Sequence, residues 1–242
     1  MSVLEELKRF LLSKGADMVG VADLRGLAPD VRYNLPFGIS IAVALNPRIV
    51  SEILDGPTKE YFAEYTRVNA LLAELGDNIA RRLNDQGNKA KWLAPTIVLH
   101  DPVTHSGVSY DPTTMSTQLP HKTAATLSGL GWIGKNAMLI TEPFGSAVRL
   151  TTVLTDADLP VGNPINSSRC GNCRKCVNAC PGHAPSGKSW FNGAIRGSFF
   201  DAFACRQTAF RLTSENVGIP ETLCGICIAA CPWTQKYIKS AR

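Results

Sequence analysis

Eight cysteines are the residues of this 242-residue sequence whose type and spacing most directly predict chemistry. The first motif is a Cys-x2-Cys-x2-Cys-x3-Cys-Pro run formed by Cys170, Cys173, Cys176, Cys180 and Pro181. In bacterial ferredoxins, the three closely spaced thiolates of such a run bind one 4Fe-4S cluster, and the cysteine before proline binds the other cluster. The spacing therefore predicts two iron–sulfur clusters and an electron-transfer role.

A second run repeats the last three cysteines of the first at a constant offset, again ending in Cys-Pro. The position equivalent to Cys170 is Glu221, so Cys205 is the cysteine left to complete the second set. Because the cysteine before proline binds the other cluster, the two sets are expected to be cross-connected. One cluster is assigned to Cys170, Cys173, Cys176 and Cys231, and the other to Cys180, Cys205, Cys224 and Cys227.

Structural zinc and disulfide bonds are the alternative uses of these cysteines. Paired Cys-x2-Cys segments suit tetrahedral zinc, and disulfides form in oxidising compartments. Neither alternative explains the third closely spaced cysteine or the repeated Cys-Pro, so clusters are favoured. Phenylalanines between the two runs are expected to pack apolar surface against the clusters: Phe199, Phe200, Phe203 and Phe210.

The composition is that of a folded, water-soluble protein, with 45% hydrophobic residues and a net charge of +5. The N-terminus lacks the basic and apolar regions of a secretory signal. The longest apolar run, Ile39 to Leu45, is too short to cross a bilayer. These features predict a reducing cytoplasm and no membrane association. The charge would suit an acidic partner or RNA, but an ordinary solvated surface explains it equally well.

The part of the chain before the cysteines alternates helix and strand patterns. Apolar residues at helical spacing predict helices over residues 3–13 and 58–84, the second of them interrupted at Gly76. Extended apolar segments predict strands over residues 17–22, 38–45, 137–141 and 147–154. A stretch rich in Pro, Gly and Asn after Asp156 then predicts a domain boundary near residue 161.

Two further segments stand out before that boundary. Residues from His100 to Pro120 form a long loop without periodicity, of the kind that usually serves function. Residues 129–136 place three glycines around Trp132. Such glycines could bring backbone against a large flat ligand, although their spacing alone favours a tight turn into the following strand.

Together, the cysteine framework, residues 129–136 and Phe144-Gly145-Ser146 resemble the epoxyqueuosine reductases, which are cytoplasmic cobalamin-dependent enzymes related to the reductive dehalogenases. The resemblance runs from about Asn34 to Lys236. It implies an α+β chain: a nitroreductase-like α/β sandwich domain over residues 1–160, then a ferredoxin-like domain with two 4Fe-4S clusters over residues 161–242. It also implies a corrinoid pocket lined by Trp132, Gly134, Lys135, Asn136, Phe144, Gly145 and Ser146.

The sequence departs from that family in two places. The family's Asp-Ser-x-Pro motif, whose aspartate is the proposed proton donor, aligns with Met115-Ser116-Thr117-Gln118. The family's longer members also continue into helical repeats, whereas this sequence ends at Arg242. We therefore expect tRNA not to be a partner, and Asp111 and His121 become the candidate catalytic residues.

The function implied by this resemblance is that of an iron–sulfur oxidoreductase. An external low-potential donor would pass electrons through both clusters to base-off cobalamin, bound either by this chain or by a partner corrinoid protein. Epoxyqueuosine reduction on tRNA is one alternative. A ferredoxin-type carrier without a catalytic site is the other, although such a carrier would not require so large an additional domain.

Overall fold

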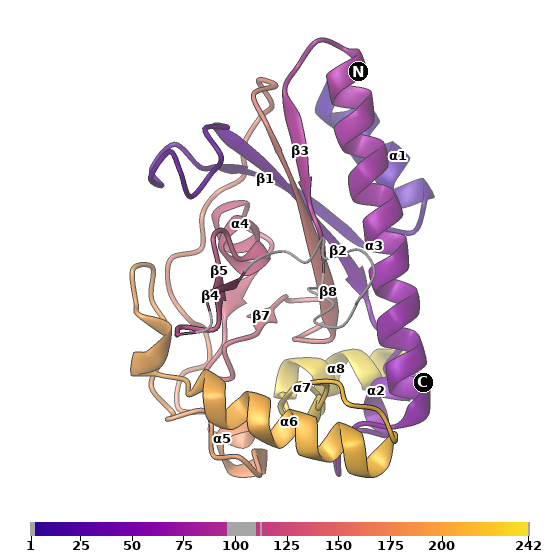
Figure 1. The fold of residues 1–242 in the computed structure, drawn as a ribbon, viewed down its shortest axis with the longest axis vertical. Helices are drawn as coiled ribbons and strands as arrows, with labels where there is room; N and C mark the ends of the chain where they lie inside the picture. The colour runs from indigo at the N-terminus through magenta and orange to yellow at the C-terminus, as the bar shows by residue number, and fades with distance from the viewer. Residues whose placement is uncertain (1–2, 96–109, 112, 242) are drawn as a thin grey trace. The chain divides into compact units, whose positions relative to one another are not determined.

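The computed structural model describes residues 3–95, 110–111 and 113–241 (Figure 1). Most of the loop predicted from His100 to Pro120 lies outside the described residues, including His100 and His105. Contacts divide the chain into two compact units, each assembled from separate segments. The first unit comprises Met1–Val43, Asn69–Leu130 and Arg149–Ile165, and the second comprises Ala44–Val68, Gly131–Val148 and Asn166–Arg242.

A four-stranded sheet with the order β1-β2-β8-β3 organises the first unit. Its strands are β1 (Met18–Asp23), β2 (Phe37–Ala44), β8 (Val148–Thr155) and β3 (Ala90–Leu93). β1 pairs with β2 and β3 pairs with β8, both antiparallel. β2 lies between two strands and is buried from Phe37 to Val43. Burial of successive residues means that protein covers both faces of this strand, because side chains alternate between the faces.

Helices cover the sheet of the first unit on both sides (Figure 1). α1 (Val3–Ser13) packs beside α3 (Lys59–Asp85), where the Arg82 guanidinium lies 4.4 Å from the centre of the Phe10 ring. α4 (His121–Leu127) contacts β1, and the short ribbon of β4 (Tyr110–Asp111) and β5 (Ser116–Thr117) precedes it. The α+β class predicted from the sequence is confirmed, and the predicted helices and long strands begin and end within one or two residues of the observed positions.

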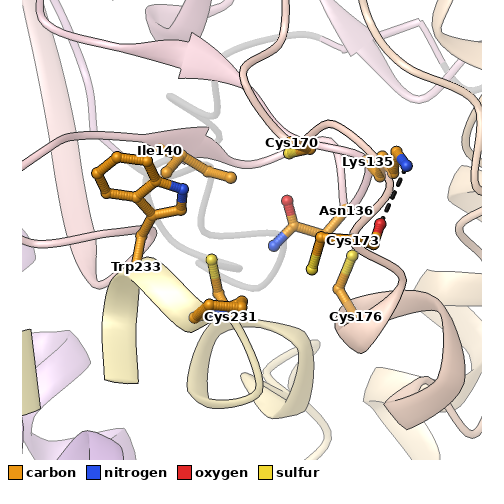
Figure 2. A pocket seen from close by; sticks show the side chains of 9 residues that line it. Lys135, Asn136, Ile140, Cys170, Cys173, Cys176, Cys231 and Trp233 are labelled. Atoms are coloured by element: carbon orange, nitrogen blue, oxygen red, sulfur yellow. Dashed lines mark hydrogen bonds between the residues drawn. The ribbon is translucent and has the colours of Figure 1, made fainter. Parts of the chain in front are cut away.

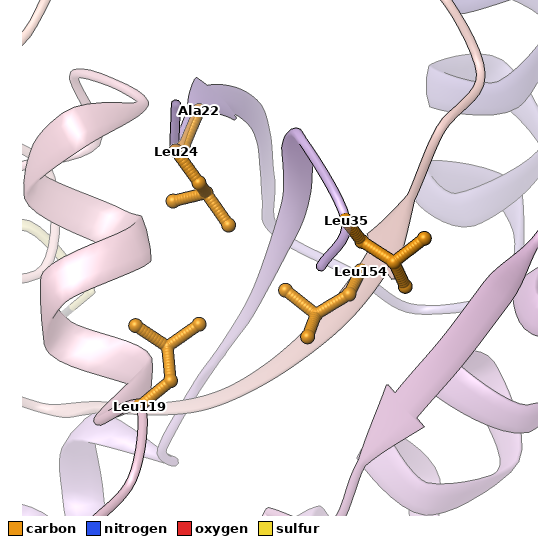
Figure 3. Packing of buried hydrophobic residues seen from close by; sticks show 5 residues of the cluster. All are labelled: Ala22, Leu24, Leu35, Leu119 and Leu154. Atoms are coloured by element: carbon orange, nitrogen blue, oxygen red, sulfur yellow. The ribbon is translucent and has the colours of Figure 1, made fainter. Parts of the chain in front are cut away.

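A cluster of buried apolar residues joins the α4 side of this unit to the sheet (Figure 3). Its members are Ala22, Leu24, Leu35, Leu119 and Leu154. Ala22 comes from β1 and Leu154 from β8, whereas Leu119 precedes α4. Removing this apolar surface from water stabilises the position of α4 on the sheet.

Gly76 lies inside α3, and the helix continues through it without interruption. The predicted break there is wrong. A Cβ atom at this position would collide with the indole ring of Trp92 on β3. Trp92 is fixed from the other side, since its Nε1 donates to Thr151 Oγ1 at 2.9 Å. Gly76 therefore provides space for Trp92 between α3 and the sheet.

We predict that Gly76→Ala destabilises the protein although alanine is the better helix former. The helix propensity gain is about 1 kcal/mol, whereas overpacking a fixed side chain costs about 1–3 kcal/mol. Thermal unfolding should show a lower midpoint for Gly76→Ala, and the added Trp92→Leu change should remove the clash. Ala70→Gly at an exposed position of α3 is the propensity control. A higher midpoint for Gly76→Ala would contradict this role of the glycine.

The second unit contains most of the short helices and every cysteine. Its elements are α2 (Pro47–Ser51), the start of α3, β6 (Trp132–Ile133), β7 (Leu139–Ile140), α5 (Lys175–Ala179), the 3-10 helix η1 (Arg196–Ser198), α6 (Ala202–Asn216), α7 (Ile226–Ala229) and α8 (Pro232–Ser240). α5 packs on α7, and α2 contacts α7 and α8. The unit is therefore assembled from three parts of the chain.

The compact units do not follow the single boundary placed near residue 161. Residues Ala44–Val68 and Gly131–Val148 precede that boundary, yet they belong to the unit that holds the cysteines. Close packing accounts for this: a Cβ on Gly225, beside Cys224, would press on Ile53 and Tyr61. The cysteine loops are supported by side chains from much earlier in the sequence.

Candidate metal centre

Four cysteines from two separate segments line one cavity in the second unit (Figure 2). The cavity has a volume of about 460 Å³, part of it open to solvent. Its lining residues are Lys135, Asn136, Ile140, Cys170, Cys173, Cys176, Cys231, Pro232 and Trp233. The first Cys-x2-Cys-x2-Cys run supplies three of the thiols, and the start of α8 supplies the fourth. This is the combination predicted for the first cluster.

Local backbone geometry places the thiols of the first run. Gly171 has φ +49°, a left-handed conformation that glycine adopts without steric cost. The turn closes where the Cys173 amide donates to the Cys170 carbonyl oxygen at 3.0 Å. α5 then begins at Lys175, so Cys176 lies in its first turn and Cys180 at its C-terminal cap. One tight turn and one short helix therefore direct four cysteines.

The second run, from Cys224 to Pro232, is also shaped by a left-handed glycine and short helices. Gly225 has φ +88° and caps α7, which carries Cys227. Cys231 then caps the N-terminus of α8, where Pro232 occupies the first turn. Proline suits that position because its missing N–H would have no partner there. The repeated Cys-Pro therefore ends one helix and starts the next, so Cys227 and Cys231 lie on different short helices.

Mutual repulsion identifies the thiols that face one another in the first group. Burial, and after it negative charge on three other cysteines, raises the pKa of the Cys176 thiol to about 11. Those neighbours are Cys170, Cys231 and Cys173. Metal ligation requires thiolates, so positive charge from iron would relieve both the burial penalty and the repulsion.

Charge interactions also connect the other four cysteines with one another. Burial raises the pKa of the Cys227 thiol, and charges on neighbouring thiols add to the effect: Cys205, Cys224, Cys176 and Cys180. Cys205 comes from α6, whose N-terminus is capped by Asp201 accepting from two backbone amides. The appearance of Cys176 in this set also indicates that the two groups are neighbours.

Four thiols are the donor set of a 4Fe-4S cluster. Among residues 3–95, 110–111 and 113–241, no three His, Cys, Asp or Glu side chains converge closely enough to hold one metal ion. In a 4Fe-4S cluster each thiolate binds a different iron, so its ligands stand farther apart than the ligands of a single ion. The donor set and the cavity of the first group fit such a cluster.

Lys135 and Asn136, which the sequence analysis assigned to a corrinoid pocket, contact the cysteine loops. The buried Lys135 ammonium donates to the carbonyl oxygens of Gly171, at 2.7 Å, and Cys173, at 3.0 Å. The Asn136 side chain donates to the carbonyl oxygen of Cys227 at 3.3 Å. Both residues lie in the turn between β6 and β7, so one hairpin is bonded to both cysteine runs.

The segment Phe144-Gly145-Ser146 packs against α8. Gly145 has φ +58°, and a Cβ there would collide with Thr234. The Ser146 amide donates to Thr234 Oγ1 at 3.0 Å. Phe144 meets Tyr237 edge to face, with ring centres 5.2 Å apart. The role of this segment at a corrinoid stays a prediction; its observed role is to hold α8.

Trp132 and Gly134 belong to the same hairpin. Trp132 is fully buried, its ring centre lies 5.1 Å from that of Trp233, and its Nε1 has no hydrogen-bond partner among the described atoms. A Cβ on Gly134 would lie 2.5 Å from Ile140 Cδ1 and 2.7 Å from Asn136 Oδ1. Gly134 therefore leaves room for a cavity-lining residue and for Asn136, which reaches the second cysteine run.

The two candidate catalytic residues are engaged within the first unit. His121 Nδ1 lies 2.9 Å from Thr152 Oγ1, and Nε2 donates to the Ala94 carbonyl oxygen at 2.8 Å. Burial lowers the pKa of His121 to about 4, so the ring is neutral near pH 7. Hydrogen bonds from Thr113 and Thr114 lower the pKa of the exposed Asp111. A catalytic role for either residue stays a prediction.

Two of the phenylalanines expected to cover the clusters are exposed. Phe199 is buried, whereas Phe203 and Phe210 on α6 keep 51% and 45% of their surface accessible. Packing of these two rings against the clusters stays a prediction. Sequence patterns did not identify the lysine and asparagine bonds to the cysteine loops, because carbonyl acceptors in a turn carry no sequence signal.

Residues 169–234 match the family model described as "4Fe-4S double cluster binding domain". This part of the chain is a double 4Fe-4S cluster domain. The match contains all eight cysteines, so the iron–sulfur prediction is confirmed at the level of the domain. Which cysteine binds which cluster stays a prediction, supported by the two groups described above.

Sequence comparison shows similarity to curated epoxyqueuosine reductases. The protein from Synechococcus sp. (strain RCC307) is 35% identical over 134 residues, which cover 52% of this chain and 38% of that protein. The one from Gloeobacter violaceus is 34% identical over 159 residues, covering 61% of this chain and 44% of that protein. The matched region thus spans less than half the length of these relatives.

Solved structures show the same fold at low sequence identity. A catabolic reductive dehalogenase has a TM-score of 0.69 at 17% identity, covering 98% of this chain and 33% of that one. An epoxyqueuosine reductase, solved with an epoxyqueuosine-modified tRNA stem loop, has a TM-score of 0.60 at 20% identity, covering 96% and 65%. The predicted resemblance to these two groups of proteins is confirmed. No helix within the described part of the chain has the length and apolar character needed to span a membrane.

If the cysteine before each proline binds the cluster of the other run, cysteine variants should damage the clusters in pairs that do not follow their order in the sequence. The wild-type protein should hold about eight irons per chain, and Cys170→Ser or Cys231→Ser should each damage the same cluster. Combining these two changes should cost little more iron than either alone, because both remove ligands of one site. Cys227→Ser with Cys231→Ser should instead damage both clusters.

Iron analysis and electron paramagnetic resonance of the dithionite-reduced variants measure these effects. Cys227→Ser alone is the matched control, since it lies four positions from Cys231 but belongs to the other group. If Cys227→Ser and Cys231→Ser altered the same cluster signal, the cross-connected assignment would be wrong. Stoichiometric zinc with little iron in anaerobically purified protein would contradict the cluster assignment altogether.

Proposed function

We propose that this protein is an iron–sulfur oxidoreductase that passes low-potential electrons through two 4Fe-4S clusters to a corrinoid. The observation that carries the proposal is the cavity lined by Cys170, Cys173, Cys176 and Cys231, within a segment that matches a double 4Fe-4S cluster domain and contains all eight cysteines. Similarity to the epoxyqueuosine reductases supports a reductase rather than a carrier alone. The corrinoid is either a cofactor of this chain or a group held by a partner protein.

The arrangement of the cysteines favours electron passage between the two sites. α5 carries Cys176 of one group and ends at Cys180 of the other. Four residues of helix span roughly 6 Å along the axis. α7 and the start of α8 repeat this relation with Cys227 and Cys231. When bound, the clusters supply one-electron transfer at low potential, and a corrinoid supplies a strongly reducing cobalt centre.

Support for the corrinoid comes from one relative and one buried group. A reductive dehalogenase of the same fold was described with a mechanism for B12-dependent dehalogenation. In this chain, the buried Trp132 offers an N–H without a partner among the described atoms, in the segment that resembles a corrinoid pocket. The segment contains no histidine or cysteine that could bind cobalt, and both ring nitrogens of His121 are engaged. We expect base-off binding, with no ligand to cobalt from this segment.

Titration with cob(II)alamin, followed by electron paramagnetic resonance, tests this proposal. We expect saturable binding and a spectrum without nitrogen splitting on cobalt. Trp132→Phe, which removes the N–H and keeps an aromatic ring beside Trp233, should weaken binding about threefold to tenfold, the value of one hydrogen bond. Unchanged iron content confirms that the variant is folded. Gly134→Gln is a less selective block than the sequence suggested, because it would also displace Asn136.

Two results would contradict parts of this proposal. Nitrogen splitting would contradict base-off binding, because a histidine or the cofactor's own base would then bind cobalt. An absence of binding, together with no reduction of corrinoid added on a partner protein, would leave the ferredoxin-type electron carrier. An external low-potential donor is required in either case.

Epoxyqueuosine reduction on tRNA is the second candidate, favoured by the 35% identity to a curated epoxyqueuosine reductase. We expect the chain not to restore queuosine in a strain that lacks epoxyqueuosine reductase, since Met115 replaces the family's aspartate. A general acid contributes about two to four orders of magnitude in rate. Met115 has φ +52°, a conformation that aspartate tolerates better than methionine. Met115→Asp is therefore the matched gain-of-function variant.

Queuosine in tRNA, measured by mass spectrometry, decides between the candidates. Efficient formation by the wild-type chain would establish tRNA as the substrate and overturn our expectation. Formation by Met115→Asp alone would show that the missing acid is what separates this chain from its relatives. A curated epoxyqueuosine reductase, expressed in the same strain, is the positive control.

A further inference from the structure

Lys135 is a buried cation beside the first cysteine group. Only 5% of the residue is accessible to solvent. Its ammonium donates to two carbonyl oxygens of the first cysteine run, those of Gly171 and Cys173. Within the described ranges, no carboxylate lies at ion-pair distance from it; the lysine's polar partners there are carbonyl groups. A buried charge without a counter-charge is costly.

The first cluster would provide that counter-charge. Lys135 lines the same cavity as Cys170, Cys173, Cys176 and Cys231 (Figure 2). Four thiolates around an Fe4S4 core of charge 2+ give a net charge of −2, and uptake of one electron makes it −3. A fixed cation stabilises the reduced state more than the oxidised state, because Coulomb attraction grows with the opposing charge.

We propose that Lys135 raises the reduction potential of the cluster at this group. The second cysteine run receives only a neutral contact from the same hairpin, the Asn136 amide on the Cys227 carbonyl oxygen. The hairpin therefore places a cation beside the first group only, whereas the cation that interacts with Cys205 of the second group is the half-buried Arg196 of η1. Removing the Lys135 charge should shift the potential of the first cluster and leave that of the second nearly unchanged. This inference requires the cysteine grouping but not the corrinoid, and it stands if corrinoid binding fails.

A redox titration of the intact iron-loaded protein tests the proposal. Dithionite supplies the electrons, one per cluster, and electron paramagnetic resonance follows the two reduction steps. Lys135→Gln removes the charge and retains amide donors, so one step should move to lower potential. At a fixed potential, the ratio of reduced to oxidised cluster should fall about tenfold, which is 59 mV for a one-electron couple. The other step should move by less than about a third of that shift.

Two further variants separate charge from packing. Lys135→Arg keeps the charge and should leave both steps close to wild type. Arg169→Gln removes a cation from the same unit, but this side chain is 51% exposed and paired with Glu142 at 2.5 Å. Solvent and its partner screen that charge, so its removal should change neither step by more than about twofold.

Each outcome supports or overturns the proposal. An unchanged titration in iron-loaded Lys135→Gln, or an equal shift of both steps, would limit Lys135 to holding the loop. If Arg169→Gln shifted a reduction step as far as Lys135→Gln does, the cause would be a general effect of surface charge, and the proposal would also be overturned. If Lys135→Gln lost iron, retention of iron by Lys135→Arg would support the requirement for charge, whereas loss in both would leave only packing.

Discussion

The structure depends on bringing mutually repelling thiols together. Burial and neighbouring charge raise the pKa of Cys176 to about 11, so the thiolates that bind metal are unfavourable without it. Metal binding supplies the compensating positive charge, which couples cluster assembly to folding of the cysteine loops. Left-handed glycines at 171 and 225 make the turns, and short helices separate the ligands of one group from those of the other.

The β6–β7 hairpin is the element that links these loops to the rest of the second unit. Lys135 and Asn136 are bonded to both cysteine runs, while Trp132 and Ser146 contact residues of α8. The glycines between them are required because side chains there would collide with neighbouring atoms. The segment that resembles a corrinoid-binding motif thus holds the cysteine loops, and changes within it are expected to affect them.

Residues with strong local patterns were predictable. The helical periodicity around Leu72, Leu75 and Ile79 located α3, and the β-branched run from Ile39 to Val43 located the interior strand β2. Gly76 was misjudged, because its effect depends on Trp92, sixteen positions later in the sequence. His121 was a catalytic candidate by residue type, and only the structure shows that it is buried with its ring nitrogens bonded to Thr152 and Ala94.

The sequence by itself determined that this chain carries two 4Fe-4S clusters, because ligand type, spacing and the Cys-Pro repeat are local properties of the chain. Tertiary structure decided which surroundings those thiols have. Residues 44–68 and 131–148 join the cysteine unit through packing between segments far apart in the chain, which no local pattern encodes. Lys135 is likewise buried only because the hairpin packs on the first cysteine run, where its ammonium donates to two carbonyl oxygens. Within the described residues it has no carboxylate partner.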